Sequence, residues 1–154
     1  MAAPPRWVRR FLTPADLEAL SRAIAEAERH TSGEIRIHLE RRLPPAPADD
    51  PVQARARDVF ARLGLHRTRQ RNGVLIYLAL EDRRLAVVGD QGVHARLGDA
   101  YWQRVRDLMV ERLRQGRVRE ALVTAVETVG GALREHFPRR PDDQNELPDR
   151  VSLG

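Results

Sequence analysis

The sequence contains no cysteine and no lysine, few aromatic residues and no long apolar run. The lack of cysteine excludes disulfide bonds, thiolate metal sites and cysteine nucleophiles. No apolar run is long enough for a signal peptide or a membrane-spanning helix, so we expect a soluble, cytoplasmic protein with no membrane span. Aromatic residues make up only 5% of the 154 residues, so aliphatic side chains must supply most of the core.

The positive charge of the chain does not indicate nucleic-acid binding. The 27 basic residues are all arginine and stand against 22 acidic residues, which gives a formal charge of +5. The arginines alternate with acids along the predicted helices instead of gathering on one face, and few aromatic rings are present to stack on bases. We therefore expect no nucleic-acid partner.

Four segments have the apolar spacing of amphipathic helices. The first begins at Thr13, an N-cap that is followed by proline, and ends at residues 32–33. The second runs from Val52 to Gly64 after a proline-rich loop. Past a loop punctuated by glycine, Asp99 begins a third helix, and Gly116 separates it from the last.

Three segments have the pattern of β-strands. Residues 34–40 alternate apolar and polar side chains, which predicts an edge or half-exposed strand with one buried face. Residues 73–80 are almost continuously apolar, which predicts a central strand covered on both faces. Residues 81–84 are polar and turn the chain into a hairpin, whose second strand is expected over residues 85–88.

The order of these elements predicts the architecture. A right-handed crossover makes the first two strands parallel, and the hairpin makes the third antiparallel to the second. The fold class is therefore α/β, a three-layer α/β/α sandwich with a small mixed central sheet. We expect one domain over residues 1–137 and an acidic, proline-containing tail over residues 138–154. This tail is either disordered or laid along the surface, where Leu147 and Val151 could dock it.

Several strings at the ends of the predicted strands, in this order and spacing, resemble the TPM domain family. They are Thr31-Ser32-Gly33-Glu34, Arg71-Asn72-Gly73-Val74-Leu75, Glu81-Asp82-Arg83, Gly89-Asp90-Gln91-Gly92 and Leu97-Gly98-Asp99. The likeness extends over roughly residues 13–137. It implies divalent-metal binding, acid phosphatase activity and a role in the assembly or repair of membrane complexes.

The topology decides which acidic residues can cooperate. The central strand is about 25 Å long, so its two ends cannot share an ion. One end gathers an amide and three carboxylates on glycine-containing loops, from Asn72, Asp90, Asp99 and Glu34. Ca²⁺ and Mg²⁺ prefer oxygen ligands of this kind, and no zinc-binding histidine spacing is present. The other end carries Glu40, Glu81 and Asp82, and the hairpin acid Asp82 makes it a second candidate.

Each residue of the candidate site also has an ordinary structural interpretation. Asp99 is equally consistent with a helix N-cap, and the Asn72-Gly73 pair with a turn that enters a strand. Asp90 fits a turn acid and Glu34 a solvated strand residue. The histidines are dispersed and are expected at the surface or its boundary. His94 is the one that lies between two of the candidate acids.

Two functions remain open at this point. The first is a non-catalytic module that binds Ca²⁺ or Mg²⁺ and acts through a protein partner, which the resemblance would associate with a membrane. The alternative is a metal-dependent acid phosphatase, in which a metal-bound water attacks and Arg67 or Arg71 holds the phosphate. The common nucleophile motifs Asp-x-Asp, Gly-x-Ser-x-Gly and Arg-His-Gly are absent, which favours the first.

Overall fold

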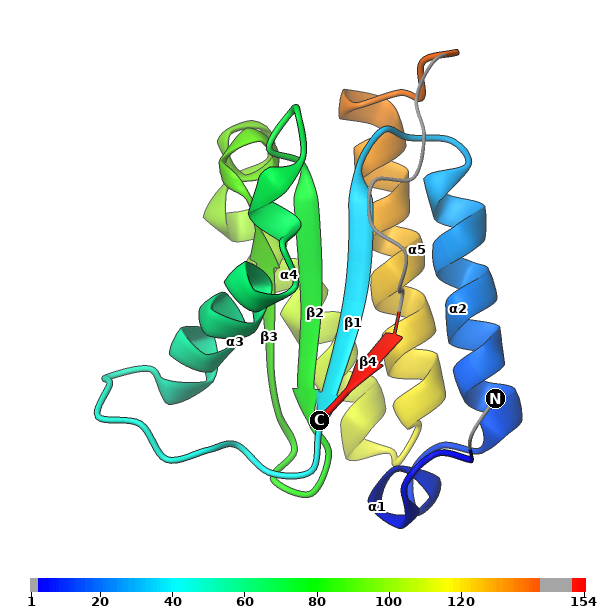
Figure 1. The fold of residues 1–154 in the computed structure, drawn as a ribbon, viewed down its shortest axis with the longest axis vertical. Helices are drawn as coiled ribbons and strands as arrows, with labels where there is room; N and C mark the ends of the chain where they lie inside the picture. Colours follow the sequence, from blue (N-terminus) through cyan, green and yellow to red (C-terminus); the bar gives the residue numbers. More distant parts are fainter. Residues whose placement is uncertain (1–2, 142–150) are drawn as a thin grey trace.

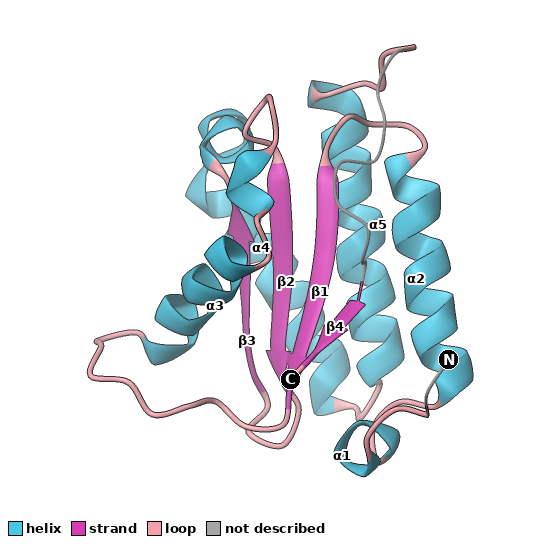
Figure 2. Cartoon of the chain, viewed as in Figure 1, coloured by secondary structure: helices cyan, strands magenta, loops and turns pink. Residues whose placement is uncertain are grey.

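The computed structural model describes residues 3–141 and 151–154. The elements in chain order are α1 (Arg6–Arg9), α2 (Pro14–Glu28), β1 (Glu34–Glu40), α3 (Pro51–Arg62), the 3₁₀ helix η1 (Leu65–Arg67), β2 (Gly73–Ala79), β3 (Arg84–Gly89), α4 (Gln91–Arg114), α5 (Val118–His136) and β4 (Val151–Leu153). Figures 1 and 2 show the strands side by side with helices in front and behind. None of the helices in the described part of the chain has the length and apolar character to cross a bilayer.

Local sequence signals set the starts of the first long helices. The Thr13 side chain accepts a hydrogen bond from the backbone N–H of Asp16, whose carboxylate accepts one from the N–H of Thr13. This reciprocal capping box satisfies two donors that the helix leaves unpaired. Asp50 caps α3 by accepting from the N–H of Gln53. The cap predicted at Thr13 is confirmed.

The sheet has the strand order β3-β2-β1-β4. β1 runs parallel to β2 and to β4, whereas β3 runs antiparallel to β2. All seven residues of β2 are buried, as expected for a continuous apolar run in the centre of a sheet. The predicted mixed sheet, its central strand and its hairpin are confirmed.

Helices cover both faces of the sheet, which confirms the three-layer α/β/α sandwich. One face packs against α2, α4 and α5 through a core that includes Ile37, Ile76, Leu20, Met109 and Val126. The other face packs against α3 through a smaller core that includes Leu75, Tyr77, Ala86, Ala56 and Phe60. The predicted α/β fold class is therefore correct, and the core is mostly aliphatic.

The prediction for residues 34–40 is wrong in one respect. β1 is an inner strand between β2 and β4, and all seven of its residues are buried, the polar ones included. The alternation identified the face that enters the large core, but it could not identify what covers the polar face. Part of that cover comes from Arg55 of α3 and Ser152 of β4, which contact Glu40 and His38.

The predicted loop before Asp99 is also corrected. Helix α4 begins at Gln91 with Asp90 as its N-cap, and Gly98 interrupts it with φ +78°. Asp99 directly follows this break and starts the second helical part of α4, as predicted, whereas the helical turns from Gln91 to Leu97 were not predicted. The sequence predicts a loop at Gly92, yet this residue lies in the first turn of α4. Glycine is required there because an added Cβ would lie 2.2 Å from the carbonyl oxygen of Gln70.

The predicted tail rejoins the domain at two places. Pro138 forms an isolated bridge with Thr31, and the N–H of Arg139 donates to the carbonyl of His30. Further on, Val151 docks on the domain, which was one of the two alternatives for the tail. It does so as part of a strand that no pattern predicted, β4. Leu147, the other expected docking residue, lies outside the described residues.

Candidate functional site

The candidate site is built at the end of the sheet where β1 and β2 begin and β3 ends. Glu34 lies opposite Gly73 in the parallel register, and Val74 lies opposite Gly89 in the antiparallel one. The backbone N–H of Asp90 donates to the carbonyl of Gly73 at 2.9 Å. This places Asn72 and Asp90 on adjacent chain segments, as the topology required.

Asn72 is buried in a small polar cluster. Its backbone N–H donates to Oγ1 of Thr68 at 3.1 Å, and its Nδ2 donates to Oγ of Ser32 at 3.1 Å and to Oε1 of Gln70 at 3.3 Å. The residue is 1% exposed. Its Oδ1 is shut off from solvent and accepts no hydrogen bond from any described residue. Buried oxygens of this kind are rare, because leaving them unpaired costs free energy.

Asp90 is buried as well, and its charge is neutralised by Arg71. Nε of Arg71 donates to Oδ2 of Asp90 at 3.0 Å, and Nη2 donates to Oδ1 at 3.5 Å. Oδ1 also accepts from the N–H of Gln91 at 2.8 Å and so caps α4. The side chain of Arg71 is 48% exposed while that of Asp90 is 7% exposed, so the guanidinium can leave this pair without crossing the core.

The loop before β2 is held against the first turn of α4. The N–H of Gly92 donates to the carbonyl of Arg71 at 2.9 Å, and an added Cβ on Gly92 would lie 2.7 Å from that carbonyl oxygen. Arg71 itself has φ +52°, a left-handed conformation that is uncommon for a residue with a side chain. Backbone contact therefore fixes the position of Asn72 relative to Asp90.

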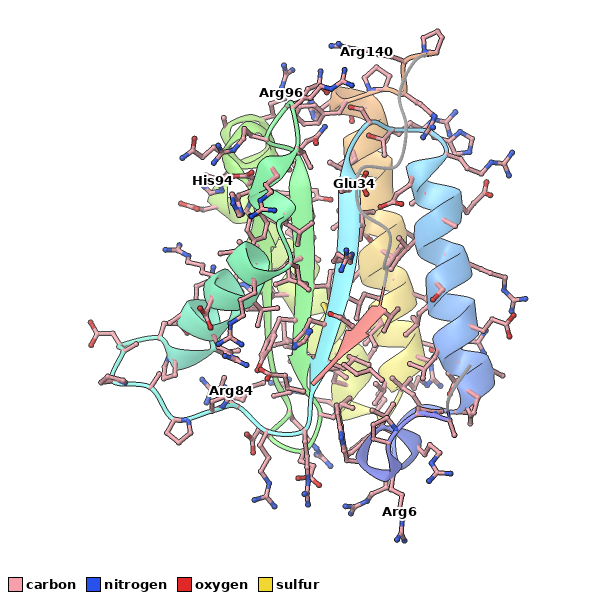
Figure 3. All side chains as sticks on the ribbon, in the orientation of Figure 1. Arg6, Glu34, Arg84, His94, Arg96 and Arg140 are labelled. Atoms are coloured by element: carbon pink, nitrogen blue, oxygen red, sulfur yellow. The ribbon has the colours of Figure 1, made fainter. Side chains whose placement is uncertain are left out.

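The other two predicted ligands lie differently. Glu34 is buried at the start of β1. Asp99 has a side chain that is 98% exposed, and its Oδ1 lies 3.5 Å from Nε2 of His94. Figure 3 shows Glu34 and His94 on opposite sides of the first residues of β2. Within residues 3–141 and 151–154, no three or more His, Asp or Glu side chains form a group that could hold a metal ion.

The acids at the opposite end of the sheet are bound by arginine or backbone groups. Glu81 accepts hydrogen bonds from Arg10, Arg41 and Arg42, at 3.3, 3.0 and 2.9 Å. The Arg42 and Arg41 guanidinium groups hold the pKa of Glu81 below its ordinary value. Oδ2 of Asp82 accepts from the N–H of Leu43 at 2.6 Å. This end is a set of loop contacts, in which every acid has a defined partner.

A buried polar network, which the sequence did not reveal, lies on the polar face of β1. Arg55 of α3 binds Glu40 through two parallel hydrogen bonds, Nε to Oε1 at 2.8 Å and Nη2 to Oε2 at 2.7 Å. The hydroxyl of Tyr77 donates to Oε1 of Glu40 at 2.6 Å. Nδ1 of His38 lies 2.6 Å from Oγ of Ser152, and its ring stacks on Tyr77. His38 is therefore not the boundary residue that was expected.

Burial and charge shift the pKa values in this network. Burial raises the pKa of Glu40, but hydrogen bonds from Arg55 and Tyr77 outweigh it and bring the pKa below the ordinary value. Burial lowers the pKa of His38, and the nearby Glu40 carboxylate only partly opposes this. Burial, together with the bond to Glu40, raises the pKa of Tyr77. At neutral pH the network therefore pairs a carboxylate with a guanidinium beside a neutral imidazole.

The Ser152, His38 and Glu40 side chains resemble a hydrolytic triad in composition only. Nε2 of His38 is 4.0 Å from Glu40, which is too long for a hydrogen bond. Both carboxylate oxygens of Glu40 are instead directed to Arg55 and Tyr77. The Glu40 carboxylate therefore does not orient the imidazole, and the contact between His38 and Ser152 joins the neighbouring strands β1 and β4.

Comparison with known proteins finds one family model and several similar solved structures. The model of the TPM domain matches residues 8–132. The solution structure of BA42 protein from the psychrophilic bacterium Bizionia argentinensis is 40% identical with a TM-score of 0.82, covering 94% of this chain and 96% of that one. The N-terminal domain of a P. gingivalis protein is 24% identical with a TM-score of 0.65, covering 84% and 83%.

A more distant structure shares the fold alone. The N-terminal domain of cg2496 protein from Corynebacterium glutamicum is 14% identical with a TM-score of 0.59, covering 98% of this chain and 91% of that one. Among curated proteins, no sequence matches this chain significantly. The similarity therefore extends over nearly the whole chain without supplying an activity.

Proposed function

We propose that this chain, which belongs to the TPM domain family, binds a divalent cation of the Ca²⁺ or Mg²⁺ class and acts through a protein partner without catalysing a reaction. The supporting observation is Oδ1 of Asn72, which is buried without a hydrogen-bond donor among the described residues. Such an oxygen can instead coordinate a cation.

Other oxygen atoms lie close to this amide, two of them beside its nitrogen. Oγ of Ser32 and Oε1 of Gln70 both contact its Nδ2, and the carboxylate of Asp90 belongs to the adjacent chain segment. Hard cations take such mixed sets of carboxylate, amide, hydroxyl and water oxygens. Glu34 and Asp99 are the predicted ligands that would have to move toward this set, Asp99 from the surface.

Arg71 is the competitor of the ion in this proposal. It neutralises Asp90 in the free protein, so a cation must displace its guanidinium before the carboxylate can bind. The affinity is therefore lower than it would be with an uncommitted carboxylate. This leads to opposite expectations for two neighbouring substitutions: Asp90→Asn removes a ligand, whereas Arg71→Gln removes the competitor.

The test is a titration of chelator-treated, ¹⁵N-labelled protein with CaCl₂ and MgCl₂. We expect the side-chain amide signals of Asn72 and Gln70 to shift, binding to weaken about tenfold or more in Asp90→Asn, and binding to tighten in Arg71→Gln. Asp82→Asn, at the opposite end of the sheet, is the matched control and should leave the titration unchanged. Spectra that do not respond to millimolar cation, or shifts centred on Asp82, would overturn the proposal.

A further inference from the structure

One edge of the sheet has no neighbouring strand in the described part of the chain. β3 is the terminal strand in the order β3-β2-β1-β4 and, among the described strands, pairs only with β2. The bond from the N–H of Asp90 to Gly73 fixes the antiparallel alternation, so that the even-numbered residues from Arg84 to Asp90 face β2. Leu85, Val87 and Gly89 consequently direct their N–H and C=O groups outward, and no backbone bond joins them to another described residue.

This edge lies in a cleft of about 800 Å³ between α3 and α4. Its floor is Val87–Asp90, and its walls include Phe60 and Arg57 of α3 and Trp102 and Arg106 of α4. Figure 1 shows α3 in front of β3 and α4 behind it. We call this cleft the β3 groove. A cleft with a sheet edge as its floor has the form that proteins use to bind an extended peptide.

The apolar part of the β3 groove is built to lie close to the strand. An added Cβ on Gly89 would be 2.3 Å from Cζ2 of Trp102, so the indole ring rests directly on the backbone at the end of β3. Nε1 of Trp102 donates to Nδ1 of His94 at 3.1 Å, which fixes the plane of the ring. Phe60 faces the same cleft from α3. Side chains of a bound strand would find apolar surface on both sides.

The charges in the β3 groove select the partner. Asp50 caps α3 and Asp90 is paired with Arg71, while Asp99 points to solvent with its Oδ1 3.5 Å from Nε2 of His94. In contrast, neither Arg57 nor Arg106 has an ion-pair partner among the described residues. Nη2 of Arg106 donates to Oε1 of Gln103, but its Nε is buried without an acceptor. A buried, unpaired guanidinium N–H is costly and calls for an oxygen acceptor.

We infer that the β3 groove binds an extended, acidic segment of a partner protein, which adds to β3 as a fifth strand and places carboxylates on Arg57 and Arg106. The outward N–H and C=O groups of Val87 and Gly89 supply the backbone bonds. The chain's own C-terminal strand does not compete for this edge, because β4 pairs with β1 at the opposite edge. This inference rests on the proposed function in one respect, the protein partner, for which it names the binding surface. It does not require the cation.

The test uses a display library of random octapeptides selected against the full chain in EDTA. We expect enrichment of peptides that combine Asp or Glu with β-branched residues, and slower hydrogen exchange at the amides of Leu85, Val87 and Gly89 when a selected peptide is bound. Because charge-assisted hydrogen bonds are lost, the double variant Arg57→Gln/Arg106→Gln should bind at least about tenfold more weakly. Arg114→Gln, on the same helix α4 but outside the groove, is the matched control.

Several results would overturn the inference. These are a library without enrichment, selected peptides whose binding is unchanged in the double variant, or protection that appears at other strands. A concentration-dependent dimer in sedimentation that protects the same three amides would assign the groove to a second copy instead. Failure of the proposed cation site is distinguishable, since it is read at Asn72 and Gln70, whereas peptide binding is measured in the presence of chelator at β3.

Discussion

Replacing Arg55 by methionine should destabilise the fold strongly, because it leaves Glu40 buried without its guanidinium. The side chain of Glu40 is 6% exposed and that of Arg55 is 17% exposed. The two hydrogen bonds between them are parallel and short, the geometry in which arginine binds carboxylates best. Removing one member of a buried pair costs about 3–5 kcal/mol, because the remaining charge has lost its partner.

The size of the effect can be converted into a thermal shift. For a chain of this length, 1 kcal/mol changes Tm by about 2–4 °C. The expected loss for Arg55→Met is therefore about 6–20 °C at pH 7. Tyr77 still donates a hydrogen bond to Glu40 in the variant. Methionine retains most of the length of the arginine side chain, so a cavity adds little to the loss of stability. Protonation of Glu40 at low pH should reduce the loss, because it removes the unpaired charge.

The assay is urea and thermal unfolding of matched variants. Arg62→Met, which breaks an ion pair with Asp58 whose members are 63% and 52% exposed, is the control and should cost less than about 1 kcal/mol. The double variant Arg55→Met/Glu40→Leu should recover much of the stability, since it removes both charges. If Arg55→Met costs no more than Arg62→Met, the reasoning about the buried pair is wrong.

Three further predictions follow from the same structure. Because burial lowers the pKa of His38, the unfolded chain binds a proton that the folded chain excludes, and stability should fall as the pH drops below about 6.5. His38→Gln should weaken this pH dependence, measured as the urea midpoint from about pH 7.5 to 5.5. Gly130→Ala should lower Tm because its Cβ would lie 2.8 Å from Cβ of Ala27, whereas Gly131→Ala, which meets nothing within 4 Å, should raise it, the helix gaining about 0.5–1 kcal/mol. With p-nitrophenyl phosphate and Mg²⁺ we expect no more than trace hydrolysis, since the common nucleophile motifs are absent; steady turnover that is lost in a folded Asp90→Ala variant would contradict this.

Much of the fold could be predicted because its signals are local. The Thr13 cap and the apolar run from Gly73 are each encoded within a few neighbouring residues. The hairpin follows from a polar turn between two apolar segments, and Arg83 adopts φ +54° in it. Chain connectivity then fixes the parallel and antiparallel pairs. These features need no knowledge of distant contacts.

The buried polar face of β1 could not be predicted, because its partners come from other elements whose packing the local pattern does not show. Glu40 meets Arg55 from α3, and His38 meets Ser152 more than a hundred residues later. An alternating strand with charged residues reads as half-exposed unless those partners are known. A signal did exist in Tyr77, a polar hydroxyl within an aliphatic run, since a buried tyrosine usually has a hydrogen-bond partner.

The candidate site was predictable in its location but not in its chemistry. Topology brought Asn72 and Asp90 to one end of the sheet, since strand order follows from connectivity. It could not show that Arg71 pairs with Asp90, because that contact depends on a left-handed backbone at Arg71. Asp99 starts a helical segment as predicted, but the residues before Gly98 are also helical, where the glycines had indicated a loop.

Asp90 connects the proposed cation site with the β3 groove, and this leads to a prediction of coupling. The residue follows the open edge at Gly89, caps α4 through Gln91 and is bound by Arg71. A cation that displaces Arg71 acts on the same carboxylate that holds the first turn of α4, one wall of the groove. Binding energies of two coupled ligands are reciprocal, so Ca²⁺ must change peptide affinity by the factor by which the peptide changes Ca²⁺ affinity.

The measurement is a pair of calorimetric titrations with a peptide selected on the β3 groove. Peptide is titrated with and without saturating Ca²⁺, and Ca²⁺ is titrated with and without saturating peptide. We expect the peptide affinity and the Ca²⁺ affinity to change by the same factor. In Asp90→Asn this factor should fall toward one, because the variant keeps the cap of α4 but removes the negative charge for which Arg71 and the ion compete. Unchanged affinities in the wild type would mean that Asp90 transmits nothing between the two sites.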